Sequence, residues 1–306
     1  MALYLGIDVG SITTKMVVMN EGDEVLAKVY LRNNGRPLEA IQQGLEIMSS
    51  RLNKEDSMDG VATTGSARHL AAYLVGAYLI KNEITAHSIA VIDLLPETKT
   101  IFEIGGQDSK VIILRAGVVV DFAMNTVCAA GTGSLLDKQA ARLGLSIEEF
   151  GRLALKAKHP VRVAGRCTVF AETDMIHKQQ IGHSVEDIVG GLCDSLVKNY
   201  LNNVCRGKEL LSPIVFQGGV AANPGIRKAL GKELETDLII PEHFGLMGAL
   251  GAAKLAKRAK PYRTQFKGFE LSRKSCSTRG FECIDFLIHC IRIPVLNRIF
   301  GTVQTL

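Results

Sequence analysis

Two cysteines stand where the sequence predicts that a loop becomes a helix. Cys128 lies within residues 126–134, and Cys167 follows 39 residues later, within residues 165–170. A thiolate at a helix start faces unpaired backbone N–H groups and the positive end of the helix dipole, which lower its pKa and favour binding of a soft metal. A cubane iron–sulfur cluster or a structural zinc takes four ligands, so two cysteines are too few. A two-fold symmetric dimer would supply the other two; the alternative is that both thiols are small buried hydrophobes.

A glycine-rich hairpin occurs twice and forms a second candidate site. Residues 3–22 read as strand, turn, strand, and the pattern returns 95 residues later, where Glu103 takes the place of Asp8. Glycines let the backbone approach a phosphate, successive N–H groups bind an anion, and hydroxyls with a lysine complete the site. A carboxylate ahead of the glycine is suited to hold Mg²⁺ through water. The predicted phosphate contacts are Gly10, Ser11, Thr13, Thr14, Lys15, Gly105, Gly106 and Gln107.

The constant offset between the hairpins indicates duplicated domains, each opening with the same element. Neither hairpin has the spacing of a Walker P-loop, and a tight turn rich in Gly, Ser and Thr is the alternative for each. A third glycine pair, Gly218 and Gly219, leaves a short apolar strand, where a nucleotide base would fit, with Asn223 nearby for polar contacts. A tight strand-to-helix turn explains this pair equally well. Residues 245–253 are mostly small and predict a helix that packs backbone to backbone.

Charge and composition exclude several classes of protein. The chain has 306 residues, is 47% hydrophobic and carries a net charge of +5. From Lys257 onward, ten Lys/Arg stand against three Asp/Glu, so residues 1–256 have a net charge of −2 and do not predict nucleic-acid binding. No apolar run is long enough to span a bilayer, so we expect no membrane segment. Seven cysteines without tight pairing favour a reducing, cytoplasmic environment.

Five motifs, in order, resemble the activator ATPases of 2-hydroxyacyl-CoA dehydratases, whose relatives include the ATPase subunits of benzoyl-CoA reductases. They are DVGS with Lys15, IGGQDSK at 104–110, CAAGTG at 128–133, CTVFAE at 167–172 and GGVAAN at 218–223. This group falls within the superfamily of actin, sugar kinases and heat-shock chaperone ATPases. The resemblance implies an α/β fold of two duplicated actin-like (ribonuclease H-like) domains with a nucleotide cleft between them. The domains would be residues 1–95, completed by a helix at 245–258, and residues 96–244, followed by a basic tail at 259–306.

The resemblance also implies a function. Members are homodimers that hold one [4Fe–4S] cluster between two subunits, with ligands that correspond to Cys128 and Cys167. Each subunit binds MgATP, receives electrons from a ferredoxin or flavodoxin, and passes one electron to a 2-hydroxyacyl-CoA dehydratase. In this scheme Asp8 holds Mg²⁺, and Gln107 or Asp108 orients the attacking water.

The sequence departs from that group in two places. Glu103 replaces the more usual Asp, which would alter the Mg²⁺ shell. The tail carries cysteines at wide spacing, Cys276, Cys283 and Cys290, to which we assign no metal. Two other functions remain open: a small-molecule kinase of the same fold, and a metal-free regulatory module that depends on nucleotide.

Overall fold

The fold is built on two five-stranded mixed sheets. The computed structural model describes residues 2–53, 57–125, 129–165, 167–259 and 266–269. The first sheet has the order β3-β2-β1-β4-β5 and consists of β1 (Leu3–Val9), β2 (Thr13–Asn20), β3 (Val25–Arg32), β4 (Gly60–Thr64) and β5 (Leu79–Ile80). The second has the order β10-β9-β6-β7-β8 and consists of β6 (Thr100–Ile104), β7 (Ser109–Arg115), β8 (Val118–Asn125), β9 (Ile214–Gln217) and β10 (Leu238–Ile239).

The two sheets have the same topology. In each, the first three strands form an antiparallel meander, and the fourth and fifth strands run parallel to the first. In β1 and β2, Asp8 lies opposite Lys15. At the same offset in β6 and β7, Glu103 lies opposite Lys110. The predicted duplication and the α/β fold class are therefore confirmed.

The repeat extends to an irregularity of the outer strands. The pairing of β2 with β3 shifts register between Val18 and Met19. The pairing of β7 with β8 shifts between Ile113 and Leu114, which again lie 95 residues later. A register shift of this kind bends a strand and increases its twist. Both sheets therefore curve at the same point.

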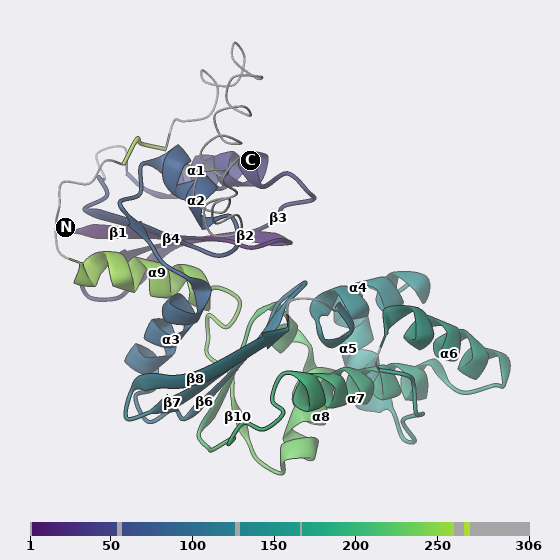
Figure 1. Cartoon of the computed structure of the whole chain (residues 1–306). Helices are drawn as coiled ribbons and strands as arrows, with labels where there is room; N and C mark the ends of the chain where they lie inside the picture. Colours follow the sequence, from purple (N-terminus) through teal and green to yellow (C-terminus); the bar gives the residue numbers. More distant parts are fainter. Residues whose placement is uncertain (1, 54–56, 126–128, 166, 260–265, 270–306) are drawn as a thin grey trace, which may run out of the picture.

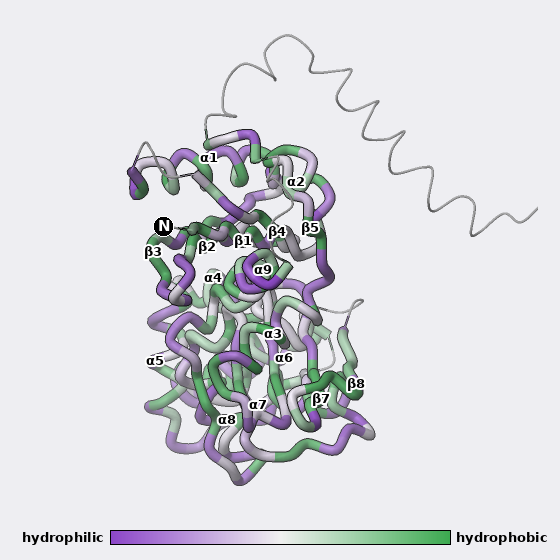
Figure 2. Tube along the Cα trace, turned by 90° about the vertical axis from the view of Figure 1, so that its left-hand side faces the viewer, coloured by the Kyte–Doolittle hydropathy of each residue, from purple (hydrophilic) through white to green (hydrophobic). Residues whose placement is uncertain are grey.

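Helices α3 (Glu83–Leu94) and α9 (Met247–Arg258) lie between the two sheets (Figures 1 and 2). One buried cluster joins them to both sheets: it includes Val17 of β2, Ile112 of β7 and Leu250 of α9. A Cβ on Gly251 would lie 1.8 Å from the carbonyl oxygen of Ala86 in α3. The small residues therefore bring the two helix backbones into contact, as the sequence predicts.

The remaining helices cover the outer face of each sheet. Helices α1 (Pro37–Arg51) and α2 (Arg68–Val75) pack on the first sheet, in a core that includes Leu5, Ile41 and Val75. The second sheet is covered by a larger core centred on Phe102, Phe150 and Tyr200. Its helices are α4 (Gly133–Arg142), α5 (Ile147–Lys156), α6 (Thr168–Gln180), α7 (Val185–Asn203) and α8 (Pro224–Leu234). Two 3₁₀ turns, η1 (Ala129–Gly131) and η2 (Gly219–Ala222), precede α4 and α8.

A short described part of the predicted tail packs on the first domain. Phe266 and Phe269 contact the core beneath α1 and α2. The backbone N–H of Lys267 donates to the carbonyl oxygen of Val75, 3.0 Å away, and its ammonium lies over the ring of Tyr73. The tail cysteines lie outside the described residues. Among the described helices, none combines the length and apolar character needed to cross a bilayer.

Candidate functional site

Two buried ion pairs lie at equivalent places on the two sheets. Lys15 Nζ is 2.9 Å from Asp8 Oδ2, and Lys110 Nζ is 2.9 Å from Glu103 Oε2. Burial raises the pKa of each carboxyl, but the adjacent lysine and the other nearby cationic groups together lower it by more, so both pKa values fall below the usual range. Both carboxylates are therefore charged at neutral pH. Because strand residues alternate between faces, both pairs point toward the layer of α3 and α9.

A glycine with positive φ stands beside each carboxylate. Gly65 follows β4 with φ +89°, and a Cβ there would lie 2.5 Å from Asp8 Oδ1. Gly218 follows β9 with φ +92°, and a Cβ there would lie 2.8 Å from Glu103 Oε1. Only glycine adopts this backbone without strain and leaves this space. The duplication therefore includes the turn that approaches each acid, and Gly65 is a site residue that sequence analysis missed.

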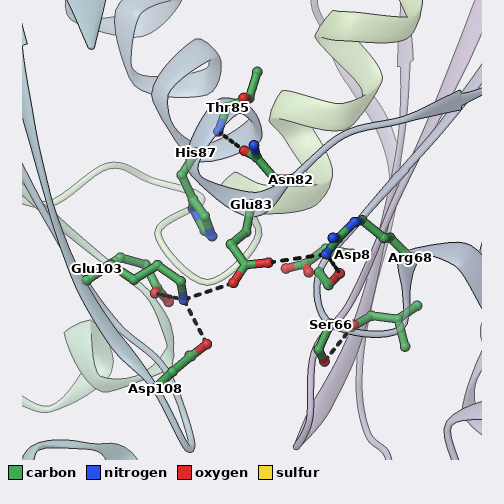
Figure 3. A network of polar contacts seen from close by, with 12 residues as sticks. Asp8, Ser66, Arg68, Asn82, Glu83, Thr85, His87, Glu103 and Asp108 are labelled. Carbon is green, nitrogen blue, oxygen red and sulfur yellow. Dashed lines mark hydrogen bonds and ion pairs between the residues drawn. The ribbon is translucent and has the colours of Figure 1, made fainter. Parts of the chain in front are cut away.

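Glu83 connects the two halves of the site. It is the first residue of α3, and its carboxylate lies 4.0 Å from the guanidinium of Arg68 and 3.9 Å from Lys110 Nζ. Figure 3 shows Glu83 between the two sheets, with Arg68 on one side and Asp108 with Glu103 on the other. Asp108 Oδ2 is itself 3.0 Å from Lys110 Nζ. Lys110 thus has three carboxylates within ion-pair distance, and both Glu83 and Arg68 were missed from the sequence.

His87 lies in the same layer, one turn further along α3. The ring is buried, and its Nδ1 lies 3.1 Å from Gln217 Nε2. Burial lowers the pKa of His87, and the charged Lys110 and Lys15 lower it further, against the opposing effect of Glu103 and Asp8. The imidazole is therefore neutral at physiological pH.

The buried neutral His87 makes folding stability depend on pH. Its pKa in the folded chain lies below the value of about 6.5 expected when unfolded, so its contribution is complete above about pH 6.5 and is lost as the pH falls through the folded pKa. We expect His87→Gln to remove up to about 1.4 kcal/mol per pH unit from the slope of unfolding free energy in that window. Urea titrations of both proteins between about pH 5 and pH 7.5 would measure this. Identical slopes would show that His87 does not titrate on unfolding.

A cleft of about 500 Å³ opens between the domains, and none of the four ion-pair residues is among the described residues that line it. The predicted site residues Thr13, Gly105, Gly106, Gly219 and Asn223 line it. Asn223 caps α8 through its Oδ1, while its buried Nδ2 has no hydrogen-bond partner among the described residues. A buried donor without a partner is costly, and a ligand in the cleft would satisfy it. Glycine backbone, a free amide donor and this volume fit a nucleotide.

One side of the cleft is closed by contacts between the domains. Arg32 of β3 forms an ion pair of 3.0 Å with Asp137 of α4. A Cβ on Gly106 would lie 2.7 Å from the side chain of Ile12, so the two hairpins touch. The residues of each pair are far apart in the chain, so the sequence does not predict either contact.

The structure separates several residues that the sequence groups together. Thr14 is buried, and its hydroxyl donates to Asn33 Oδ1 at 2.7 Å, on the opposite face of β2 from Lys15. Ser11 and Gln107 are exposed at the tips of the hairpins, and Gly10 donates its N–H to the carbonyl of Thr13 within its own turn. Thr14 is therefore not directed toward the cleft.

The start of α4 is attached to the second hairpin. The N–H groups of Gly133 and Ser134 donate to the carbonyl oxygens of Gly105 and Gly106, at 2.9 Å and 2.8 Å. The Ser134 hydroxyl also donates to Gly106, at 2.5 Å. Since α4 begins at Gly133, the 3₁₀ turn η1 separates it from position 128, and its first amides bind the hairpin. The helix that follows Cys128 therefore begins further along the chain than the sequence predicts.

Cys167 is the N-cap of α6, where the sequence predicts a loop-to-helix transition. Its thiol is half-buried and makes no side-chain capping bond, which suits a metal ligand at a helix start. Cys128 lies outside the described residues. Among the described residues, no group of three or more His, Cys, Asp and Glu is placed to hold a metal. Cys193 and Cys205 are buried, and burial raises the pKa of both, to about 12 for Cys205.

Comparison with known proteins extends over most of the chain. Residues 5–256 match the BadF/BadG/BcrA/BcrD ATPase family. The chain is 33% identical to the (R)-2-hydroxyglutaryl-CoA dehydratase activating ATPase of Acidaminococcus fermentans, over 84% of this chain and 98% of that protein. The activator of the 2-hydroxyisocaproyl-CoA dehydratase from Clostridium difficile, solved with bound ADPNP, superposes with a TM-score of 0.78 at 34% identity, over 84% of this chain and 95% of that one.

A more distant structure shows how far the fold extends. A ROK family glucokinase from Streptomyces griseus has a TM-score of 0.50 at 13% identity, over 84% of this chain and all of that one (100%), which shows a shared fold alone. The first two matches have an identity and coverage that establish kinship. This chain belongs to the BadF/BadG/BcrA/BcrD ATPase family.

Proposed function

We propose that this protein is an ATP-hydrolysing activator that delivers a low-potential electron to a 2-hydroxyacyl-CoA dehydratase or a related benzoyl-CoA reductase. The relatives named above are dehydratase activators, and one was solved with an ATP analogue. In this proposal two copies share one [4Fe–4S] cluster through Cys128 and Cys167, a ferredoxin or flavodoxin donates the electron, and the protein acts in the cytoplasm. Residues 1–95 with the helix at 245–258 form one domain, and residues 96–244 form the other.

The hydrogen bonds between α4 and the second hairpin carry this proposal. Gly105 and Gly106 line the nucleotide cleft, and their carbonyl oxygens accept bonds from Gly133 and Ser134. Cys128 stands only five residues ahead of Gly133 in the chain. A shift of the hairpin on nucleotide hydrolysis would therefore move the start of α4, and with it the segment that follows Cys128. A conformational change driven by ATP needs such a connection between the two sites.

The residues of the cleft have distinct roles in nucleotide hydrolysis. The N–H of Gly106 binds phosphate, because the N–H of Gly105 already donates to the carbonyl oxygen of Asp108, and Asn223 Nδ2 donates to the nucleoside. Asp8 and Glu103 are charged, so each would bind a water of hydrated Mg²⁺ through the oxygen that its lysine leaves free. Lys15 and Lys110 hold these carboxylates in place. Gln107 or Asp108 orients the attacking water.

At the subunit contact, Cys167 would bind iron from the start of α6, and Cys128 from the segment ahead of η1. A bound [4Fe–4S] cluster supplies one-electron transfer at low potential. The chain's own part is to orient the thiolates and to exclude water from them. Raising one electron by about 200 mV costs roughly 5 kcal/mol, which a nucleotide-driven rearrangement supplies and a single rearranged hydrogen bond does not.

Iron content tests the proposal directly. We expect protein purified without oxygen to contain about four irons and four sulfides per dimer, and Cys128→Ala and Cys167→Ala to lose both. Cys193→Ala is the matched control, because its thiol is buried in the core around Tyr200 and should leave the iron content unchanged. Iron and sulfide analysis, the visible spectrum and the mass in solution provide the readouts.

A colourless protein that binds ATP with all cysteines intact would contradict the electron-donating role. Phosphorylation of an added sugar or acid would then indicate a small-molecule kinase of the same fold. ATP binding without either property would indicate a regulatory module.

A further inference from the structure

A second, larger cavity lies away from the nucleotide cleft, beside the segments that carry the cysteines. Its volume is about 1270 Å³. Its walls are one face of α7 with Arg206 just beyond that helix, the loop at residues 160–165, and Asn125 at the end of β8. Asn125 and Gly165 stand three and two residues ahead of Cys128 and Cys167 in the chain. Nothing in the nucleotide site accounts for this cavity.

The cavity carries a concentration of positive charge. Arg162, Lys198 and Arg206 line it together with a single acid, Asp194. Within the described part of the chain, none of these three cations forms an ion pair or a side-chain hydrogen bond. The body of the protein, residues 1–256, has the opposite net charge of −2. Unpaired cations gathered on one surface of an acidic body create a local field that attracts an acidic partner.

The walls of the cavity are held rigidly, so it is a formed site. Ser195 Oγ donates to the carbonyl of Val163 at 2.9 Å, and Asn199 Nδ2 donates to the carbonyl of Gly165 at 2.5 Å. A Cβ on Gly191 would lie 1.8 Å from the carbonyl oxygen of Val161, so the loop lies directly on α7. Asn199 Oδ1 would also be 2.9 Å from a Cβ on Gly131, which follows Cys128. Asn199 of α7 therefore contacts both the loop ahead of Cys167 and the turn that follows Cys128.

The size and charge of the cavity select its occupant. It exceeds the range of about 300–1,000 Å³ that is typical of small-ligand pockets, and its three cations are exposed. A two-fold axis through the cavity would bring these like charges together, so a second copy meets the chain beside the cavity and not within it. Nucleic acid is disfavoured, because its phosphates would be repelled by the net negative charge of residues 1–256. An acidic polypeptide segment is large enough for the cavity and carries the charge that its cations attract.

We propose that this cavity, lined by Arg162, Lys198 and Arg206, docks an acidic segment of the protein that accepts the electron. The inference rests on the proposed function for its choice of partner. Docking there would hold the acceptor beside the segments that carry Cys128 and Cys167, which short-range electron transfer requires.

A labelled hexaglutamate peptide serves as the probe, with binding measured by fluorescence anisotropy at low and at high salt. We expect Lys198→Gln/Arg206→Gln to weaken binding about tenfold, since it removes two charges of the cavity. The matched control is Lys228→Gln/Lys232→Gln, which removes two exposed charges that line a separate hollow on α8 and should change binding less than about twofold. Binding to the original protein should weaken at high salt.

Several outcomes would overturn the docking site. These are equal effects of the two double variants, no binding to the original protein at low salt, and displacement of the peptide by inorganic phosphate at constant ionic strength, which would indicate a small-anion site. Dissociation of a dimer by the cavity variant would indicate an interface between copies. Peptide binding by protein that lacks iron would leave the docking site standing while contradicting the proposed function.

Discussion

Replacing Gly251 by alanine is expected to destabilise the protein by about 3 kcal/mol. The new Cβ would lie 1.8 Å from the carbonyl oxygen of Ala86, and 2.5 Å from its carbonyl carbon. Both atoms belong to the backbone of α3, so no side-chain rotation relieves the clash, and the two helices must separate. Because this contact lies between the sheets, separation also loosens the core that joins α9 to β2 and β7. Urea unfolding would measure the change.

Gly231→Ala is the matched control for this substitution. Gly231 is also inside a helix, α8, but among the described residues a Cβ there would meet only the carbonyl oxygen of Thr236, at an ordinary 3.5 Å. We expect this variant to be stabilised by about 0.5 to 1 kcal/mol, because alanine restricts the unfolded chain and favours helix. Equal stability of the two variants would contradict the close approach of α3 and α9.

Asp8→Asn is expected to destabilise the protein more than Glu103→Gln, although the two acids occupy equivalent places. Asp8 is the only described carboxylate within ion-pair distance of Lys15, so its loss leaves a mostly buried ammonium, 16% exposed, without an anion, at a cost of about 3 kcal/mol. Lys110 keeps Asp108 at 3.0 Å and Glu83 at 3.9 Å when Glu103 is neutral, so we expect a cost of about 1 kcal/mol. Unfolding in urea compares the two.

A double variant separates stability from catalysis. Asp8→Asn/Lys15→Met removes both charges of the pair, and we expect it to recover most of the stability lost in Asp8→Asn. If Asp8 holds Mg²⁺, the double variant should still lack ATPase activity. Recovery of ATP hydrolysis together with stability would show that Asp8 has only a structural role.

The duplication could be predicted because corresponding residues of the two hairpins are separated by the same number of positions in the sequence. The positions of Asp8 and Lys15, and of Glu103 and Lys110, follow from hairpin pairing, and pairing across a hairpin is local. Strand alternation would also have separated Thr14 from Lys15, because neighbours on a strand point to opposite faces. Grouping these two residues by their spacing alone overlooks that rule.

Contacts between elements far apart in the chain were not predictable in this way. Glu83 meets Arg68 and Lys110 only because α3 lies between the sheets, and its position depends on how Gly251 lets α9 approach. The attachment of α4 to Gly105 and Gly106 also joins separate segments, and nothing in the local pattern of either segment signals it. The close packing of small residues decides these contacts. The spacing of apolar residues within one segment does not predict that packing.

The contact between α3 and α9 has a mechanical consequence. At Gly251 and Ala86 the two helix backbones touch, and glycine places no side chain at this point of contact. At this point no side chain has to change rotamer when the helices roll or slide over one another. A hinge at this point would therefore meet little resistance from side chains. The binding energy of a nucleotide would then set the angle between the domains.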